Sequence, residues 1–310
     1  MAFDYTCALG VRPSNALRTP RSVGSFSDTL LAQTGAGSRR IWGASPLLAV
    51  LIALALAGGC ASAPRKPPTG TPDPDRFLFE RGTAELNDKD WFTAREYFRQ
   101  LVDSYPQSQF RGDAKLGVGD TYLGEGTAES YVLAVNEFKE FLSFYPTHRR
   151  VDYAQYKLAM CHFYQMRDPM RDQTETLEAI RELVTFVERF PNAQRSALYP
   201  DAQAKLREAR DRIGEHELGV GIQYHRTRWY PGAIERLKPL VDKDPGFTRR
   251  DAAYFYLADS YDKVGRPAEA LPWFDRLIKE FERSEYLEKA QLRATAIRAQ
   301  MDKKSGETHP

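Results

Sequence analysis

Cysteine and histidine are the side chains of this chain best suited to bind a metal or to form a nucleophilic site. Cys7, Cys60 and Cys161 lie far apart and form neither a zinc spacing nor a redox pair. Cys161 lies in a helical pattern between aromatic residues, which is typical of a buried small apolar side chain. The neighbours His216 and Glu217 would point to different faces of a helix. No ligand spacing emerges from the five histidines, which stand at positions 148, 162, 216, 225 and 309.

Two glycine pairs are the only candidates for binding a phosphate. Gly117-Val-Gly119 and Gly219-Val-Gly221 are too short for a phosphate-binding fingerprint and fall inside helical pattern, which favours helix packing. No nucleophile with a matching acid and base is evident either. We therefore expect no enzymatic activity, no cofactor and no metal.

The charge balance excludes a further class of function. The first 59 residues hold five of the 44 basic and two of the 42 acidic residues, so 39 basic and 40 acidic residues remain. A protein that binds nucleic acid usually carries a clear basic excess. We therefore expect no nucleic-acid partner.

Cys60 is the one cysteine whose surroundings in the sequence predict a chemical modification. Leu56-Ala57-Gly58-Gly59-Cys60 resembles a bacterial lipobox, in which small residues precede a cysteine that receives diacylglycerol and is then freed and acylated again. Arg39-Arg40 and the apolar run 46–57 precede it, as in a signal peptide, and the run is too short to span a bilayer comfortably. We predict a signal peptide over 39–59 and lipidation at Cys60. The alternative is a plain secretory signal with an incidental cysteine.

Several acyl chains on one residue would hold the protein stably in a lipid bilayer. Ala61 stands where many lipoproteins retained at the inner membrane carry aspartate, so we expect an anchor in the periplasmic leaflet of the outer membrane. Residues 1–38 do not fit a signal peptide, and we expect translation to start downstream, at Val23 or Leu30. The proline-rich, apolar-poor stretch 60–75 is predicted to be an extended, disordered tether.

The elements beyond residue 75 follow a repeat. An alanine is followed four, seven and eleven positions later by a large apolar residue, and proline comes next in the first four copies. This spacing keeps one helical face in line, so each copy predicts a helix. Only Asp244 breaks the apolar rule. The copies are Ala94-Phe98-Leu101-Tyr105, Ala134-Phe138-Phe141-Tyr145, Ala179-Leu183-Phe186-Phe190, Ala233-Leu237-Leu240-Asp244 and Ala270-Phe274-Leu277-Phe281.

A second apolar-periodic segment precedes each of these helices, so the pattern predicts an all-α, tetratricopeptide-like solenoid of about five helix pairs. Small residues where two helices could cross closely are Gly82, Gly119, Ala159 and Ala258. We predict repeats 1–3 over 76–198, and a long bridging helix, repeats 4–5 and a capping helix over 199–303. A frayed tail would follow over 304–310.

The spacing of the prolines exceeds a 34-residue period, which predicts insertions around 124–127 and 166–173. The charged run 207–212 is typical of a solvated helix face with pairs four residues apart.

Several segments together are similar to the BamD family of outer-membrane assembly lipoproteins. They are Tyr145-Pro-Thr-His148 with Val151-Asp-Tyr153 and Tyr156, Arg171-Asp-Gln173 with Arg189-Phe-Pro-Asn192, and 206–212 with His216-Glu217 and Ala233-Ile-Glu-Arg236. The resemblance covers about residues 76–300. It implies a scaffold of the β-barrel assembly machinery without a catalytic step.

By this resemblance, the N-terminal repeats receive unfolded outer-membrane proteins, and the C-terminal repeats dock on the periplasmic domains of the barrel-forming subunit. Candidate residues of the client groove are Phe79, Tyr122 and Tyr156 on the first helices of the early repeats, although the pattern favours core packing over client contact for each of them. Other readings remain open. A tetratricopeptide lipoprotein could serve pilus secretin assembly or cell-envelope division, and a periplasmic enzyme would need a catalytic cluster.

Overall fold

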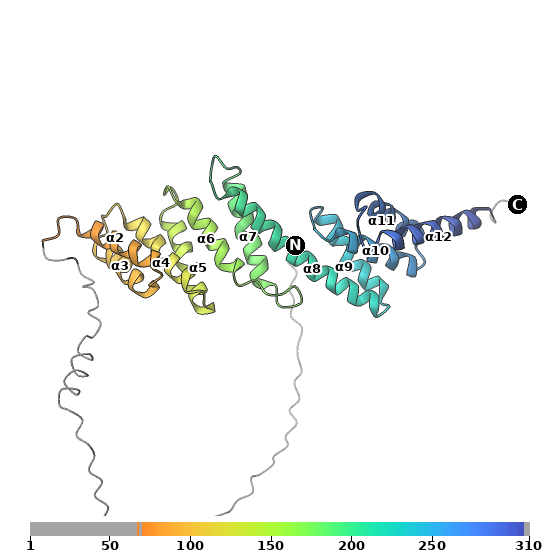
Figure 1. Cartoon of the computed structure of the whole chain (residues 1–310), viewed down its shortest axis with the longest axis horizontal. Helices are drawn as coiled ribbons and strands as arrows, with labels where there is room; N and C mark the ends of the chain where they lie inside the picture. Colours follow the sequence, from red (N-terminus) through yellow and green to blue (C-terminus); the bar gives the residue numbers. More distant parts are fainter. Residues whose placement is uncertain (1–66, 68–69, 307–310) are drawn as a thin grey trace, which may run out of the picture. The chain divides into compact units, whose positions relative to one another are not determined.

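The computed structural model describes residue 67 and residues 70–306, and these residues contain eleven α-helices and no strand (Figure 1). Each helix packs mainly on its neighbours in sequence, so the helices form five successive pairs followed by one more helix. The predicted all-α, tetratricopeptide-like fold is confirmed. The helices are α2 (Pro74–Asn87), α3 (Trp91–Ser104), α4 (Arg111–Glu125), α5 (Ala128–Phe144), α6 (Val151–Phe163), α7 (Thr174–Arg189), α8 (Tyr199–Arg226), α9 (Tyr230–Lys243), α10 (Arg250–Lys263), α11 (Pro267–Glu280) and α12 (Leu287–Gly306).

The predictions for the N-terminal segment lie outside the described residues. They concern the extension 1–38, the signal peptide 39–59, Cys60 and the first part of the tether. The helical part begins at Pro74, two residues before the predicted start of the first repeat. Proline suits this position because the first amide of a helix has no partner within the helix.

The alanine of each repeat lies at the centre of the packing. All five alanines are fully buried, because a methyl group lets two helix backbones approach closely at this point. The large apolar residues of the repeat line the same face, and Phe98, Phe138, Phe186, Leu237 and Phe274 are each at most 2% exposed. The alanines are Ala94, Ala134, Ala179, Ala233 and Ala270.

The two glycines predicted at helix crossings, Gly82 and Gly119, are confirmed in this role. A Cβ atom at Gly82 would lie 2.8 Å from the ring of Phe98, and one at Gly119 would lie 2.7 Å from the ring of Phe138. Real Cβ atoms do not approach other atoms so closely, so each glycine makes room for an aromatic ring of the facing helix. Gly117 does the same on another side of Phe98. The glycine pairs thus serve packing and do not form a phosphate loop.

The second helix of each of the first four pairs stops two residues before its proline. The residue between them has φ between −128° and −122° and ψ between 53° and 80°, as expected before proline. The helix α11 ends in the same way at Glu280, although no proline follows Phe281. Pro239 and Pro272 lie inside α9 and α11, so proline by itself does not end these helices.

The prediction of an inserted loop around residues 124–127 is wrong. The helix α4 continues to Glu125, Gly126 closes it with φ +70°, and Thr127 already caps α5. Thr127 Oγ1 accepts the Ser130 amide at 3.1 Å, and Ser130 Oγ accepts the Thr127 amide at 2.9 Å. A left-handed glycine and a reciprocal cap therefore make a tight turn here.

The second predicted insertion, residues 166–173, is a loop that packs against α8. His216 Nδ1 lies 2.6 Å from the carbonyl oxygen of Pro169, and Arg212 Nη1 donates to the carbonyl of Arg167 at 2.8 Å. The Met170 sulfur lies against Gly219, where an added Cβ would be 2.7 Å away. The loop therefore ties the third pair to the long bridging helix.

A recurring hydrogen bond fixes the turns between pairs. In three of these turns a serine hydroxyl donates at 2.6 Å to an aspartate in the first turn of the preceding pair. The same serine oxygen accepts the backbone amide two residues later. The pairs are Ser108 with Asp75, Ser196 with Asp152, and Ser284 with Asp251.

Candidate functional site

The three residues predicted for a client groove lie on the first helices of their pairs, Phe79 on α2, Tyr122 on α4 and Tyr156 on α6. Phe79 and Tyr122 belong to one hydrophobic cluster, and Tyr156 packs against the next cluster. The ring of Phe79 stacks on Phe110 with centroids 5.1 Å apart. The ring of Tyr156 meets Phe186 edge-on, and its hydroxyl bonds to Asp201.

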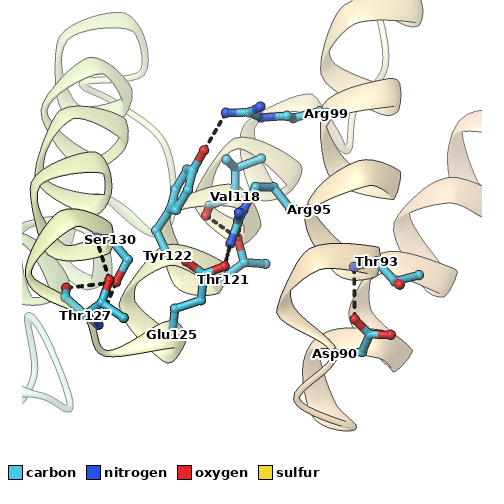
Figure 2. Close-up of polar contacts among 10 residues, drawn as sticks. All are labelled: Asp90, Thr93, Arg95, Arg99, Val118, Thr121, Tyr122, Glu125, Thr127 and Ser130. Carbon is cyan, nitrogen blue, oxygen red and sulfur yellow. Dashed lines mark hydrogen bonds and ion pairs between the residues drawn. The ribbon is translucent and has the colours of Figure 1, made fainter. Parts of the chain in front are cut away.

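Tyr122 is the most enclosed of the three, with 6% of its surface exposed. The guanidinium group of Arg95 lies over its ring at 3.8 Å, and Arg99 Nη2 donates to its hydroxyl at 2.6 Å. Arg95 also donates to Thr121 Oγ1 at 3.0 Å and pairs with Glu125. Figure 2 shows both arginines reaching from α3 to the tyrosine on α4.

This arrangement assigns Tyr122 a packing role. Arg95 covers one face of its ring, so an aromatic client side chain could stack on that face only after the guanidinium moved. Phe79 and Tyr156 are half-buried and keep part of their rings at the surface. Whether either of them contacts a client stays a prediction.

A pocket of about 550 Å³ opens between α7, α8 and α9. Its apolar lining comes from Leu177 and Ile180 of α7, Ile213 of α8, and Pro239 and Leu240 of α9. The helices α7 and α9 each pack on α8, which forms the floor. The pocket thus lies where the predicted N-terminal and C-terminal repeats meet at the bridging helix.

Charged residues surround this apolar lining. Arg236 pairs with Glu217 at 3.4 Å. The side chains of Arg210, Lys243 and Glu235 also line the pocket, and none of them takes part in a hydrogen bond or ion pair with another described residue. Two of these three unpaired groups are positive. The pocket can therefore accept apolar side chains accompanied by carboxylates.

Asp244, which breaks the apolar repeat, has a structural partner at the rim of this pocket. Arg207 donates from Nη1 to Oδ1 at 2.8 Å and from Nη2 to Oδ2 at 2.6 Å. This hydrogen-bonded pair lowers the pKa of Asp244 below its ordinary value of 3.8 and raises the pKa of Arg207. Arg207 also pairs with Asp211 at 2.9 Å, four residues along the helix. The run 207–212 therefore binds neighbouring elements and is not merely a solvated face.

The polar groups that fix the turns were not predicted from the sequence. His148 of the segment Tyr145-Pro-Thr-His148 occupies the turn position that Ser108 and Ser196 occupy elsewhere, and its Nδ1 accepts the Arg150 amide at 3.2 Å. Ser108 and His148 each stand two residues after a proline, which is a signal in the sequence for this position, whereas Ser196 stands five residues after Pro191 and gives no such signal. The histidine has a structural role in the turn.

Among residues 67 and 70–306, no group of three or more His, Cys, Asp or Glu side chains could hold a metal ion. Cys161 is fully buried, and burial raises the pKa of its thiol to about 12. None of the described helices is both long and apolar enough to cross a membrane.

The sequence profile of the family YfiO, described as outer membrane lipoprotein, matches residues 72–271. Outer membrane protein assembly factor BamD of Caulobacter vibrioides is 30% identical over 226 residues, which are 72% of each chain. The chain belongs to the BamD family.

Two further family members are more distant. The chain is 24% identical to BamD of Vibrio cholerae over 228 residues, 70% of this chain and 91% of the relative. It is also 24% identical to BamD of Neisseria meningitidis over 260 residues, 78% of this chain and 92% of the relative. The family match spans α2 to the first residues of α11 and so includes the pocket between α7, α8 and α9.

Proposed function

We propose that this BamD-family protein is a non-catalytic scaffold of outer-membrane β-barrel assembly. Its relatives carry the name outer membrane protein assembly factor. A row of helix pairs in which each pair contacts mainly its neighbours offers a long binding surface, which suits a scaffold.

The observation that carries the proposal is the pocket on the bridging helix. It combines an apolar floor at Ile213 with the unpaired cations Arg210 and Lys243. Such a pocket fits a folded partner domain that inserts an apolar side chain and sets a carboxylate beside it. We assign this partner as the barrel-forming subunit, bound through its periplasmic domains.

The test is a titration of the purified full chain with the periplasmic domains of that subunit. The double variant Arg210→Glu/Lys243→Glu should weaken binding about tenfold or more, because like charges facing each other across an interface cost several kcal/mol. The matched control is Lys139→Glu on α5, an exposed lysine away from the pocket. Equal affinities for the double variant and the control would contradict the docking site.

We place client binding on the first helices of the N-terminal repeats. Phe79 and Tyr156 are the accessible candidates, because Tyr122 is covered by Arg95. In a cross-linking assay with an unfolded outer-membrane protein, Phe79→Ala should lower the adduct yield. The outer-facing Phe144→Ala on α5 is the control, and equal loss in both variants would argue against the groove.

The anchor completes the proposal. Acylated Cys60 would hold the protein in the periplasmic leaflet of the outer membrane, and residues 60–73 would form the tether up to the first residue of α2. Support comes from the signal-peptide pattern before Cys60 and from the description of the matched family as outer membrane lipoproteins.

A further inference from the structure

The helices of the first three pairs present two different edges. Ser108 in the turn between α3 and α4 bonds to Asp75 at the start of α2, so the turns between pairs lie at the same edge as the starts of the first helices. The turns within pairs lie at the other edge. Figure 1 shows the turns after α4, α6 and α8 along the lower side of the row. We call the edge formed by residues 88–92, 125–133 and 164–175 the inner-turn edge.

Bulky apolar side chains are exposed along the inner-turn edge. Phe92 and Val132 stand two residues before the alanines of the first two repeats and are 57% and 56% exposed. Tyr164 and Met170 add exposed surface in the third turn. At the matching position the third repeat carries Leu177, which is 56% exposed and lines the pocket between α7, α8 and α9, and the fourth and fifth repeats carry Pro231 and Ala268. The exposed bulky side chains at this repeat position are therefore confined to the early repeats.

Neighbouring turns of this edge are in contact. The rings of Tyr131 on α5 and Tyr164 after α6 stack with centroids 6.3 Å apart. They line a pocket of about 310 Å³ together with Arg167, Asp172 and Glu175, and Glu175 also pairs with His162 at 2.7 Å. The two aromatic rings beside the carboxylate of Asp172 can receive a cationic side chain.

The charges of the inner-turn edge also favour a cationic partner. The turn segments 88–90, 125–129 and 164–175 hold seven acidic residues against three basic ones. Arg95 compensates Glu125, but the side chains of Glu129 and Asp168 take part in no hydrogen bond or ion pair with other described residues. The turns at the opposite edge, 105–110, 145–150 and 190–198, hold three arginines and no acidic residue.

The inner-turn edge is also preorganised. Asp90 Oδ1 accepts the Thr93 amide at 3.1 Å at the start of α3, and the Thr127–Ser130 cap fixes the start of α5 (Figure 2). A surface that is already ordered loses little conformational entropy when a partner binds.

From these observations we infer that the inner-turn edge docks a partner protein through a segment in which lysine or arginine alternates with apolar residues. The acidic excess would repel anionic lipid headgroups. A second copy would offer its arginine-bearing edge, but Arg149 and Arg150 there already bind the buried carboxylate of Asp113, at 2.7 and 3.5 Å. This contact is separate from the pocket between α7, α8 and α9 and goes beyond the function proposed above.

The test places a photo-reactive amino acid at Val132 in the full chain within intact outer membranes, followed by sequencing of the cross-linked peptide. We expect a peptide from another protein that carries lysine or arginine among apolar residues. The adduct should fall at least fivefold when Glu129→Lys and Asp168→Lys are added. The control Asp103→Lys, an exposed carboxylate toward the opposite end of α3, should leave the yield unchanged.

Other outcomes would overturn the inference. These are a lipid adduct, a peptide of this same chain, an acidic or uncharged partner peptide, no adduct, or a yield that charge reversal does not change. The variants leave Arg210 and Lys243 intact, so binding of the barrel-forming subunit in the titration above is scored separately. A failure here would leave that proposal standing, and the reverse also holds.

Discussion

At the scale of single residues, Asp244 shows how a break in a pattern can mark an interaction. The repeat predicts a large apolar residue at this position, where Tyr105, Tyr145, Phe190 and Phe281 stand in the other copies. Asp244 instead accepts two hydrogen bonds from Arg207, which lies 37 residues earlier on the bridging helix. The ion pair between Arg207 and Asp244 therefore joins the end of α9 to α8, in place of an apolar contact.

We predict that the pair of Asp244 and Arg207 makes the stability of the fold depend on pH. The pKa of Asp244 is lowered in the folded protein by its hydrogen bonds with Arg207, so the stabilisation is present at neutral pH and is lost as the pH falls through the lowered pKa. Asp244→Asn should lower the unfolding free energy at pH 7 by about 1 kcal/mol, moderated by the partial exposure of the pair.

The measurement is chemical denaturation at several pH values. The stability of the unmodified protein should fall more steeply than that of Asp244→Asn between about pH 5 and pH 2. Asp103→Asn, a change at an exposed carboxylate, serves as the control and should leave the slope unaltered. Parallel curves for Asp244→Asn and the unmodified protein would rule out the stabilising role of this ion pair.

At the scale of the elements, two helices cross closely where a side chain of one helix fills the space left by a glycine of the other. Leu237 of α9 is fully buried against Gly221 of α8, where an added Cβ would lie 2.5 Å from the leucine side chain. The crossing of α8 and α9 therefore tolerates neither a larger residue on α8 nor a polar one on α9.

Leu237→Asp should destabilise the fold by roughly 3–5 kcal/mol, since it removes a buried side chain and buries a charge without a partner. Leu237→Met keeps volume and polarity and should cost less than about 1.5 kcal/mol. Thermal melting of both variants gives the comparison. Similar melting temperatures for the aspartate and methionine variants would mean that Leu237 does not lie in the seam.

Spacing along the chain was enough to predict the helix pairs, the buried alanines and the close crossings at Gly82 and Gly119. These features depend on which residues share one helical face, and that is a local property. The partner of Asp244, and the bonds from turn serines to aspartates at helix starts, depend on how the helices pack on one another, which spacing does not reveal. The turn at Gly126 was misjudged as an insertion because α4 and α5 are themselves longer than the first pair.

For the candidate site, the sequence placed Phe79, Tyr122 and Tyr156 on the correct helices but could not tell their surroundings. Tyr122 is covered by Arg95, whose position depends on the register of α3 against α4. The pocket between α7, α8 and α9 was not predicted, because its lining comes from three helices whose residues span 177 to 244.

At the scale of the whole molecule, the proposed anchor sets where the scaffold works. Cys60→Ser should leave the helical region folded, because α2 begins fourteen positions later, at Pro74. The variant should move from the outer-membrane fraction to the soluble periplasmic fraction, since the acyl chains supply the binding energy. Sedimentation with unchanged membrane association would contradict the lipid anchor, and circular dichroism of both forms controls for folding.

The most direct test of the scaffold is co-purification from solubilised outer membranes with the full chain as bait. The account predicts that the barrel-forming subunit is recovered with the unmodified chain and with Lys139→Glu, and is largely lost with Arg210→Glu/Lys243→Glu. Recovery of a pilus secretin in its place, or of no barrel-forming subunit at all, would contradict the account.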